Sequence, residues 1–382
     1  MPSLHDRGPH SRFLEKQYQI PELEFELQII KWRVLVFFPM ANRGVLMINV
    51  GTPDEPTVES VRSYLREFLL DPDVIDAPYL VRQLLVRGII LRVRPRKVAP
   101  LYKKIWMEEG SPLRVYSERI ADSVSAILND TKIEHAMRYG NPSIKDGLQK
   151  LMDSGVNELL LLPMFPHYAQ ATTETALKHA YKELKDLDWQ PDIIEMGNFQ
   201  TDDNYINPLA GSIEPHLDDD THLLFSYHGL PVSHVKRVDR SKNHCQKVNN
   251  CCSISCDANE LCYGHHCMET SIAVSKKLGL PSDRWSISFQ SRLGPVKWLT
   301  PSTSDMVRKL VERGVRKLAI VAPAFLADGL ETLEELDIGI REEFEEHGGD
   351  RLTVIKCLND NPDWIAGLTD MVEQKFSPSV PA

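Results

Sequence analysis

The sequence predicts an α/β protein made of two similar Rossmann-like domains, and three observations support this prediction. Short apolar runs alternate with segments of helical periodicity from about residue 44 onward, a pattern typical of parallel strands connected by helices. The chain has 382 residues, which is long enough for two domains. A pattern of helix, Gly-Val, apolar strand, Pro and Phe occurs twice, at 144–168 and 304–328. We therefore expect two parallel sheets, each flanked by helices, with a ligand-binding cleft between the domains.

Eight segments are predicted to be strands. Most of them are almost continuously apolar, as parallel strands covered by helices on both faces should be. In chain order they are 44–50, 132–139, 157–165, 192–198, 221–228, 284–290, 316–323 and 351–357. Helical periodicity predicts helices between them, among others at 57–70, 144–155, 304–314 and 331–348.

The clean alternation of strands and helices begins only near residue 40. Residues 1–39 contain the apolar stretch 27–38, which lies too deep in the chain for a signal peptide and lacks a small-residue cleavage site. We expect residues 1–39 to be an N-terminal extension that is disordered or results from a misplaced start codon. We place the two domains at 40–200 and 201–382. The missing export signal predicts a cytoplasmic protein.

The net charge of −10 argues against general binding to nucleic acid. The segment 79–106 differs from the rest because it mixes apolar residues with eight basic ones, namely Arg82, Arg87, Arg92, Arg94, Arg96, Lys97, Lys103 and Lys104. One interpretation is a solvated helical face. The other is a surface that binds anions, either lipid headgroups or an acidic substrate. The second interpretation leaves open a peripheral contact with the inner membrane.

Residues that follow the predicted strands are functional candidates, because ligands of parallel α/β sheets bind beyond the carboxyl ends of the strands. His228 ends the strand 221–228, where a neutral imidazole can accept a proton or bind a metal, although an isolated His is more often structural. Glu331 and Glu335 are spaced i, i+4 on a predicted helix that Asp328 precedes, so they share one face. They either enter the cleft or form an acidic helix start that faces solvent.

Three further residues near strand ends either contact a ligand or simply pack in the protein. Trp298 lies in a Gly- and Pro-rich loop and is suited to stack on a flat ligand. Arg138 and Tyr139 end a strand and place an anion-binding fork beside a ring. Neither a G-x-G-x-x-G motif after a strand nor a G-x-x-x-x-G-K motif is present, which argues against a nucleotide enzyme.

Six of the seven cysteines lie within the segment 240–267, in the pattern C-x5-C-C-x3-C-x5-C-x4-C. Clustered cysteines in a cytoplasmic protein more often bind metal or perform redox chemistry than form disulfides. Four thiolates suffice for a 2Fe–2S cluster and equally for a structural zinc ion. The spacing by itself therefore leaves both metal centres open.

Six stretches resemble the ferrochelatase family, whose members insert Fe(II) into a porphyrin in haem synthesis. They are LMINVGTPDEP (46–56), EEGSPLRVYSERI (108–120), MRYGNP (137–142), SYHGLP (226–231), FQSRLGPVKWLTPST (289–303) and PAFLADGLETLEELD (323–337). Each alone is a weak signal, but all six in this order are specific. The resemblance implies chelatase-type domains, a porphyrin (protoporphyrin IX before others) and Fe(II) as substrates, and the release of two pyrrole protons.

The resemblance also implies roles for the residues after the strands. His228 matches the family's catalytic histidine, which abstracts protons, binds the metal or does both, and Glu331 matches the glutamate opposite it. Glu335 and Asp328 would extend an acidic path away from the ring. Several family members have His where this chain has Gly329, so Glu331 and Glu335 would act without that histidine.

The porphyrin pocket implied by the resemblance has aromatic, polar and aliphatic walls. Its residues in this chain are Val50, Ser111, Arg138, Tyr139, Trp298 and Phe325. In relatives, the segment of Ser111 contacts the propionate side of the porphyrin, and the aromatics corresponding to Trp298 and Phe325 lie near the macrocycle.

The resemblance favours a 2Fe–2S cluster over zinc, because many ferrochelatases carry such a cluster and some bacterial relatives hold it in an internal insert. The expected ligands are Cys245, Cys252, Cys256 and Cys262, with Cys251 as the substitute for Cys252.

Two other functions compete with iron insertion. One is a chelatase for another metal or tetrapyrrole, against which the segment QSRLGPVKWL argues. The other is a non-catalytic redox sensor that binds porphyrin or haem, against which the presence of both His228 and Glu331 argues. The residues leave open whether the porphyrin is protoporphyrin or coproporphyrin, which differ in their peripheral carboxylates.

Overall fold

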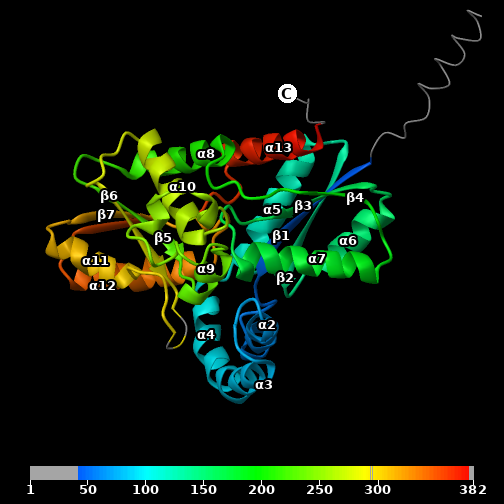
Figure 1. Ribbon diagram of the computed structural model, residues 1–382, viewed down its shortest axis with the longest axis horizontal. Helices are drawn as coiled ribbons and strands as arrows, with labels where there is room; N and C mark the ends of the chain where they lie inside the picture. Colours follow the sequence, from blue (N-terminus) through cyan, green and yellow to red (C-terminus); the bar gives the residue numbers. More distant parts are fainter. Residues whose placement is uncertain (1–41, 293, 295, 378–382) are drawn as a thin grey trace, which may run out of the picture. The chain divides into compact units, whose positions relative to one another are not determined.

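The computed structural model describes residues 42–292, 294 and 296–377. The predicted extension, residues 1–39, lies outside the described residues. The described chain contains two four-stranded sheets, and every neighbouring pair of strands in them is parallel. Helices flank both sheets (Figure 1), so the α/β prediction is confirmed.

The two sheets share one topology. The first has the order β2-β1-β3-β4 and the second the order β6-β5-β7-β8. The first sheet consists of β1 (Arg43–Gly51), β2 (Thr131–Tyr139), β3 (Glu158–Pro163) and β4 (Asp192–Glu195). The second consists of β5 (His222–His228), β6 (Trp285–Gln290), β7 (Lys317–Val321) and β8 (Arg351–Val354). The sheets fall on either side of residue 200, and the exact domain boundaries stay a prediction.

Successive side chains of a strand point to opposite faces, and this explains the continuously apolar strands. In β3, Leu160 and Leu162 belong to one core cluster and Leu159 and Leu161 to another. The second of these clusters lies under α6 (Ile144–Asp153) and α7 (Thr175–Asp186). Both faces of the strand are therefore buried, as parallel sheets require.

The two halves of the chain share one core. Val45 and Leu160 of the first sheet and Leu223 and Phe225 of the second belong to the same buried cluster. This cluster receives side chains from α5 (Pro112–Ile127), α8 (Asp203–Ile213), α9 (Val232–Val238), α10 (Tyr263–Lys277) and α13 (Pro362–Phe376). The C-terminal helix α13 packs against α5 and α8, so the end of the chain returns to its first half (Figure 1).

The repeated sequence pattern produces the same local structure twice. Ser143 caps α6 and Ser302 caps α11 (Thr303–Glu312), each by accepting a hydrogen bond from the backbone N–H three residues on. Gly155 and Gly314 follow these helices with φ of 76° and 92°, a conformation that glycine adopts without a steric penalty. Each glycine turns the chain into the next buried strand.

The second sheet has its own outer layer. Leu224 of β5 packs in a cluster with α11, with the π-helix η6 (Glu331–Ile340) and with α12 (Arg341–Glu346). The remaining elements are short. The π-helix η2 (Gln170–Glu174) precedes α7 in the first half, and the second half contains η3 (Glu214–His216), α9 (Val232–Val238), η4 (Cys251–Ser253) and η5 (Asp257–Asn259).

Four consecutive helical elements form a lobe with a core of its own, which we call the helical lobe. Its residues Val61, Leu69, Val86 and Tyr102 are buried together. The lobe consists of α2 (Val58–Leu70), α3 (Tyr79–Gln83), the π-helix η1 (Leu84–Ile90) and α4 (Leu91–Ile105). Leu330 packs against its core, so the lobe reaches the start of η6. None of the described helices is long and apolar enough to cross a membrane.

Candidate active site

His228 is the last residue of β5, where it faces the carboxyl edge of the second sheet. Its Nδ1 lies 2.7 Å from the carbonyl oxygen of Gly229. Because a carbonyl only accepts hydrogen bonds, Nδ1 carries the proton and Nε2 keeps a free lone pair. Burial lowers the pKa of His228, although the charge of Glu335 and the bond to Gly229 act in the opposite direction. The imidazole is therefore neutral at pH 7 and can accept a proton at Nε2.

Glu331 and Glu335 lie on the first turns of η6 and are partly buried. Burial raises the pKa of Glu331, and the charge of Arg94 opposes this. Burial and the charge of Glu331 raise the pKa of Glu335, although Ser291 donates a hydrogen bond to its carboxylate. Both carboxyl groups are therefore better proton acceptors than exposed glutamates.

The helix that carries these glutamates differs from the prediction in one respect. Its predicted location at 331–348 is confirmed, but its first ten residues form a π-helix before α12 continues as an α-helix. Glu331 and Glu335 still share a face, because four residues span close to one turn in both geometries. Gln290, at the end of β6, donates a hydrogen bond of 3.0 Å to the carbonyl of Glu331 and so ties the helix to the sheet edge.

Gly329 leaves space for the carboxylate of Glu331. A Cβ atom at residue 329 would lie 3.3 Å from Oε2 of Glu331, which is closer than an ordinary van der Waals contact. A larger side chain at this position would therefore displace the carboxylate. Phe325, at the preceding turn, places its ring in an edge contact with His228 at 6.2 Å between centroids.

The helical lobe adds three residues near the carboxylates that sequence reasoning missed. Burial raises the pKa values of Tyr64 and Tyr102. The charge of Glu331 raises both further, in Tyr64 after the effect of Tyr102. Arg94 acts on both glutamates. Only Arg94 had a signal in the sequence, as part of the basic segment 79–106. The two tyrosines lie in ordinary helical periodicity, and their position depends on how the lobe packs.

Val50 and Ser111 lie at the carboxyl end of the first sheet. Val50 is partly buried near the end of β1. Ser111 directly precedes α5, is 2% exposed, and its hydroxyl lies 2.6 Å from the hydroxyl of Thr52. The hydroxyl therefore already has a protein partner, and its predicted contact with the propionate side stays a prediction.

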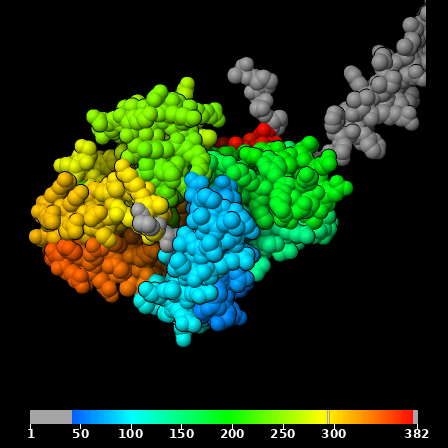
Figure 2. All heavy atoms as spheres, turned by 60° about the horizontal axis from the view of Figure 1, so that its bottom comes forward, coloured from blue at the N-terminus to red at the C-terminus, as the bar shows by residue number. Residues whose placement is uncertain are grey.

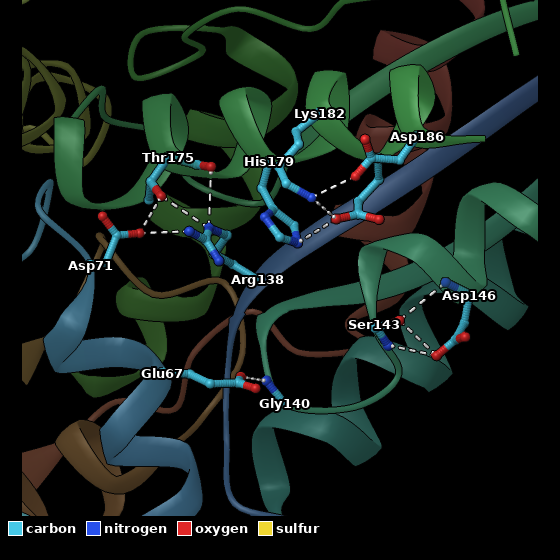
Figure 3. A network of polar contacts seen from close by, with 11 residues as sticks. Glu67, Asp71, Arg138, Gly140, Ser143, Asp146, Thr175, His179, Lys182 and Asp186 are labelled. Atoms are coloured by element: carbon cyan, nitrogen blue, oxygen red, sulfur yellow. Dashed lines mark hydrogen bonds and ion pairs between the residues drawn. The ribbon is translucent and has the colours of Figure 1, made fainter. Parts of the chain in front are cut away.

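Arg138 forms a polar network with Asp71 and Thr175 (Figure 3), and Tyr139 also bonds to Asp71. The Asp71 carboxylate accepts bonds of 2.6 Å from Arg138 and 2.8 Å from Tyr139, and Thr175 donates a third of 2.7 Å. Burial raises the pKa of Asp71, but these bonds and a backbone bond from Asp73 outweigh it, so the net pKa is lowered. The network joins α2, β2 and α7, and the predicted contact of this pair with substrate remains untested.

Asp328 is equally well bonded. It is 2% exposed, and its carboxylate accepts bonds from Thr332 at 2.9 Å, from the backbone of Cys357 at 3.2 Å and from Asn359 at 2.7 Å. These contacts connect the start of η6 to the loop that precedes α13. Its predicted part in an acidic path stays a prediction, and its contacts are those of a structural residue.

Trp298 is partly buried and packs close to the loop after β5. Its Cε3 atom would lie 3.4 Å from a Cβ atom at Gly229, and it bridges to Pro231. Its indole Nε1 is buried and has no hydrogen-bond partner among the described residues. A buried indole N–H usually has a partner, but this one is enclosed by the protein, so the predicted contact of Trp298 with a ligand stays a prediction.

The cysteine-rich segment brings four sulfur atoms together. The Sγ atoms of Cys251 and Cys252 are 4.0 Å apart, a hydrogen bond couples Cys252 to Cys262, and Cys245 interacts with both Cys251 and Cys262. The bond with Cys252 lowers the pKa of Cys262 to about 6 against the effect of burial, with help from the N–H groups of His265 and Gly264 at the start of α10.

The environment of Cys256 differs from that of these four cysteines. It is exposed, and its Sγ is 3.7 Å from Nδ1 of His244. In the part of the chain that the structure describes, no three His, Cys, Asp or Glu side chains are arranged to hold a metal ion. The predicted ligand set therefore stays a prediction, and Cys251 is placed at least as favourably as Cys256.

The cysteine-rich segment contacts the candidate active site through one residue. Tyr263 directly follows Cys262 and begins α10. Its hydroxyl donates a hydrogen bond of 2.9 Å to the carbonyl of His228. The cysteine-rich segment and His228, the candidate base, are thus connected by the buried side chain of Tyr263.

The comparisons with known proteins agree with this geometry. The family model described as ferrochelatase matches residues 42–376. A ferrochelatase of Pseudomonas fluorescens (strain Pf0-1) is 40% identical over 337 residues, which are 88% of this chain and 98% of that protein. A ferrochelatase of Coxiella burnetii (strain CbuG_Q212) is 42% identical over 341 residues, or 87% of this chain and 94% of that protein.

One solved structure, of SirB from Bacillus subtilis with Fe3+, has a similar fold. It is aligned with a TM-score of 0.50 and 9% identity, and the alignment covers 87% of this chain and 95% of that chain. At this identity the likeness concerns the fold alone. The family model and the identity to curated relatives, each over most of the chain, decide the assignment: the chain belongs to the ferrochelatase family.

Proposed function

We infer that this chain is a ferrochelatase, an enzyme that inserts Fe(II) into a porphyrin to form haem. The family match and the 40% identity to a curated ferrochelatase support this function over a chelatase for another metal and over a non-catalytic sensor. The observation that carries it in the structure is that a neutral His228 lies near Glu335, which shares one face of η6 with Glu331, both glutamates being partly buried. Iron insertion needs such groups, because two pyrrole protons must leave as the metal enters.

We propose His228 as the base that takes these protons. Its Nε2 has a free lone pair, and the nearby charge of Glu335 stabilises the imidazolium that forms. Glu331 and Glu335 either deliver Fe(II), for which carboxylate oxygens are suitable ligands, or carry protons away. The raised pKa values of both carboxyl groups suit the second task. Trp298 and Phe325 would contact the macrocycle from the side of His228.

We propose protoporphyrin IX as the porphyrin. Its vinyl groups are apolar, whereas coproporphyrin carries carboxylates in their place. The proposed porphyrin pocket includes the apolar and aromatic side chains of Val50, Trp298 and Phe325, all partly buried, and these suit the more apolar substrate.

The test of function and substrate is anaerobic metal insertion. Purified protein is mixed with Fe(II) and either protoporphyrin or coproporphyrin, and loss of porphyrin fluorescence is followed. Turnover with protoporphyrin at the higher rate supports both proposals. A faster reaction with coproporphyrin rejects the substrate, and tight porphyrin binding without turnover rejects the enzyme in favour of a sensor.

We propose that the cysteine-rich segment holds a 2Fe–2S cluster through Cys245, Cys252, Cys256 and Cys262, with Cys251 in place of Cys252 as the alternative. The donor chemistry fits, because several sulfur atoms gather here and the start of α10 favours the thiolate of Cys262. Such a cluster would supply a redox-active iron centre and would cross-link a segment that has little core of its own.

Elemental analysis tests the cluster. Iron with acid-labile sulfide supports it, and zinc alone rejects it. Serine variants of the five cysteines then identify the ligands, because each ligand variant loses the visible absorption of the cluster. If Cys256→Ser keeps that absorption and Cys251→Ser loses it, then Cys251 is a ligand and Cys256 is not.

We propose further that the protein is cytoplasmic and contacts the inner membrane peripherally through the helical lobe. Seven large apolar side chains are exposed there on consecutive elements, namely Tyr79, Leu80, Val81, Leu84, Leu85, Ile89 and Val93. Exposed apolar residues interspersed with basic ones are typical of surfaces that lie on membranes. Co-sedimentation of the variant Leu80→Asp/Leu84→Asp with vesicles tests the contact, and binding equal to that of the unmodified protein would reject it.

A further inference from the structure

The helical lobe contains an arginine-lined pocket with no assigned role. Its volume is about 670 Å³, and its lining residues are Arg62, Arg66, Arg87, Leu91, Arg92 and Arg96. The arginines come from α2, η1 and α4, so tertiary packing brings them together from separate parts of the chain. In Figure 2 the lobe, blue to cyan, comes forward between the green first half and the yellow-to-orange second half. We call this feature the arginine pocket.

The positive charges of the arginine pocket have almost no carboxylate partners. Within the described residues, Arg66, Arg87, Arg92 and Arg96 have no carboxylate within 4 Å, and Arg62 alone has an ion pair, with Glu59 at 4.0 Å. Glu59 is exposed, so this pair contributes little. Arginine cannot release its charge at neutral pH. Five guanidinium groups around one cavity therefore repel one another unless an anion joins them.

The arginine pocket is separate from the candidate active site. Arg94 is the arginine of α4 whose charge acts on Glu331 and Glu335. Arg92 and Arg96 each lie two residues from it, which is roughly 200° around an α-helix. Helix α4 therefore directs Arg94 to the carboxylates and its two neighbours to the arginine pocket. The basic residues of α4 therefore lie on two faces, with Arg94 on the face near the carboxylates and Arg92 and Arg96 at the arginine pocket.

The surroundings of the arginine pocket indicate the source of its anion. Exposed Leu84 and Ile89 flank Arg87 on η1, and exposed Val93 follows Arg92 on α4. Guanidinium forks bind phosphate oxygens in pairs, and an apolar rim lets the same surface contact acyl chains. We propose that the arginine pocket binds the phosphate group of an anionic lipid headgroup. This inference rests on the membrane contact proposed above and gives it a specific ligand.

Vesicle binding of two charge-matched variants tests the proposal. Arg92→Gln/Arg96→Gln removes two pocket charges, and Lys276→Gln/Lys277→Gln removes two exposed charges at the end of α10. With vesicles of phosphatidylcholine and phosphatidylglycerol, we expect the arginine variant to bind roughly 10- to 30-fold more weakly. The lysine variant should bind like the unmodified protein. Equal losses in the two variants would overturn the proposal, because net charge alone would then explain binding.

A conservative variant separates phosphate recognition from charge. Arg92→Lys/Arg96→Lys keeps both charges but loses the forks, so it should bind phosphatidylglycerol vesicles more weakly while binding vesicles charged with oleate unchanged. Binding of both vesicle types at the level of the unmodified protein would reject a phosphate site. The midpoint of thermal unfolding without lipid shows that each variant folds.

Two more arms separate this proposal from the membrane contact on which it rests. Inorganic phosphate should raise the midpoint of thermal unfolding of the unmodified protein and of Leu80→Asp/Leu84→Asp, but not of Arg92→Gln/Arg96→Gln. If phosphate acts in this way while no vesicle binds, the source is free phosphate, and both the lipid source and the membrane contact are wrong. If vesicles bind and the arginine variant behaves like the lysine variant, the membrane contact stands and the arginine pocket is not its site.

Discussion

The carboxyl edges of the two sheets have the same topology and opposite chemistry. At the edge of the first sheet, Arg138 and Tyr139 are held by Asp71, whose pKa their bonds and that of Thr175 lower. At the edge of the second, His228 keeps a free Nε2 and lies near the charge of Glu335, and the pKa values of Glu335 and of Glu331 on the same helix are raised. A carboxylate that is fully paired, such as Asp71, stabilises the fold. Carboxyl groups whose pKa is raised by burial take up and release protons more readily near neutral pH, as proton-transfer groups of active sites do. We therefore predict that the first edge mainly stabilises the fold and that the second carries the chemistry.

The largest expected effect concerns the base. His228→Ala removes the proton acceptor, so we expect the rate of iron insertion to fall by about 10²- to 10⁴-fold. Porphyrin binding, measured by fluorescence quenching, should remain. Arg138→Lys is the matched change at the other edge and should reduce the rate far less. If His228→Ala inserted iron at an unchanged rate, the edge of the second sheet would not supply the base.

The second effect concerns the paired edge. Asp71→Asn leaves the partly buried Arg138 without its counterion, so we expect the free energy of unfolding in urea to fall by about 3 kcal/mol at pH 7. The pKa of Asp71 is lowered in the folded protein, so its contribution is present above the unfolded value and is lost as the pH falls through the folded one. The difference between variant and unmodified protein should therefore shrink in acid. Asp54→Asn, at an exposed carboxylate, is the control and should change little.

A smaller effect of opposite sign is expected at the chemical edge. The pKa of Glu331 is raised in the folded protein, so the folded state holds its proton above the unfolded pKa, and stability falls as the pH rises through that window. Glu331→Gln removes this cost. We expect the variant to be more stable than the unmodified protein at pH 7, but not at pH 4, and to insert iron more slowly. Lower stability at pH 7, measured by urea unfolding, would show that the carboxylate is paired.

The smallest effect tests the link between the cysteine-rich segment and the base. Tyr263→Phe removes one hydrogen bond to the carbonyl of His228, which costs about 1 kcal/mol of stability. If Tyr263 positions His228, kcat should fall severalfold with KM unchanged, and the acidic limb of the pH–rate profile should shift. Tyr181→Phe, which removes a bond from an exposed phenol to Glu195, is the control. Identical profiles for the two variants would leave Tyr263 only a packing role.

Sequence reasoning succeeded where the signal is local. All eight strands were predicted, and the signal is strongest where burial on both faces demands a continuous apolar run, as in ELLLLP of β3. The duplicated pattern predicted two similar domains. In both copies of the pattern, the helix begins with a serine cap and is followed by a glycine of positive φ. The i, i+4 spacing of Glu331 and Glu335 was enough to place them together on one helix.

Sequence reasoning missed what depends on long-range pairing. Arg138 reads as an available anion-binding fork, but Asp71, which holds it, is 67 residues earlier in the chain. Tyr64, Tyr102 and Arg94 reach the carboxylates only because the helical lobe packs against the start of η6. Backbone geometry was missed as well, since nothing in the local pattern distinguishes the π-helical start of η6 from an α-helix.

The sequence by itself determined the alternation of strands and helices, the duplicated architecture, the family motifs and the residues at the strand ends. These follow from periodicity and from short-range turn chemistry, which neighbouring residues specify. Only the tertiary structure decided which polar groups are paired and which remain free. It placed Arg94 of α4 near the glutamates and directed Arg92 and Arg96 of the same helix to a separate cavity, which they line with Arg62, Arg66 and Arg87. Pairing depends on distances between segments far apart in the chain, and those distances are set when the cores form.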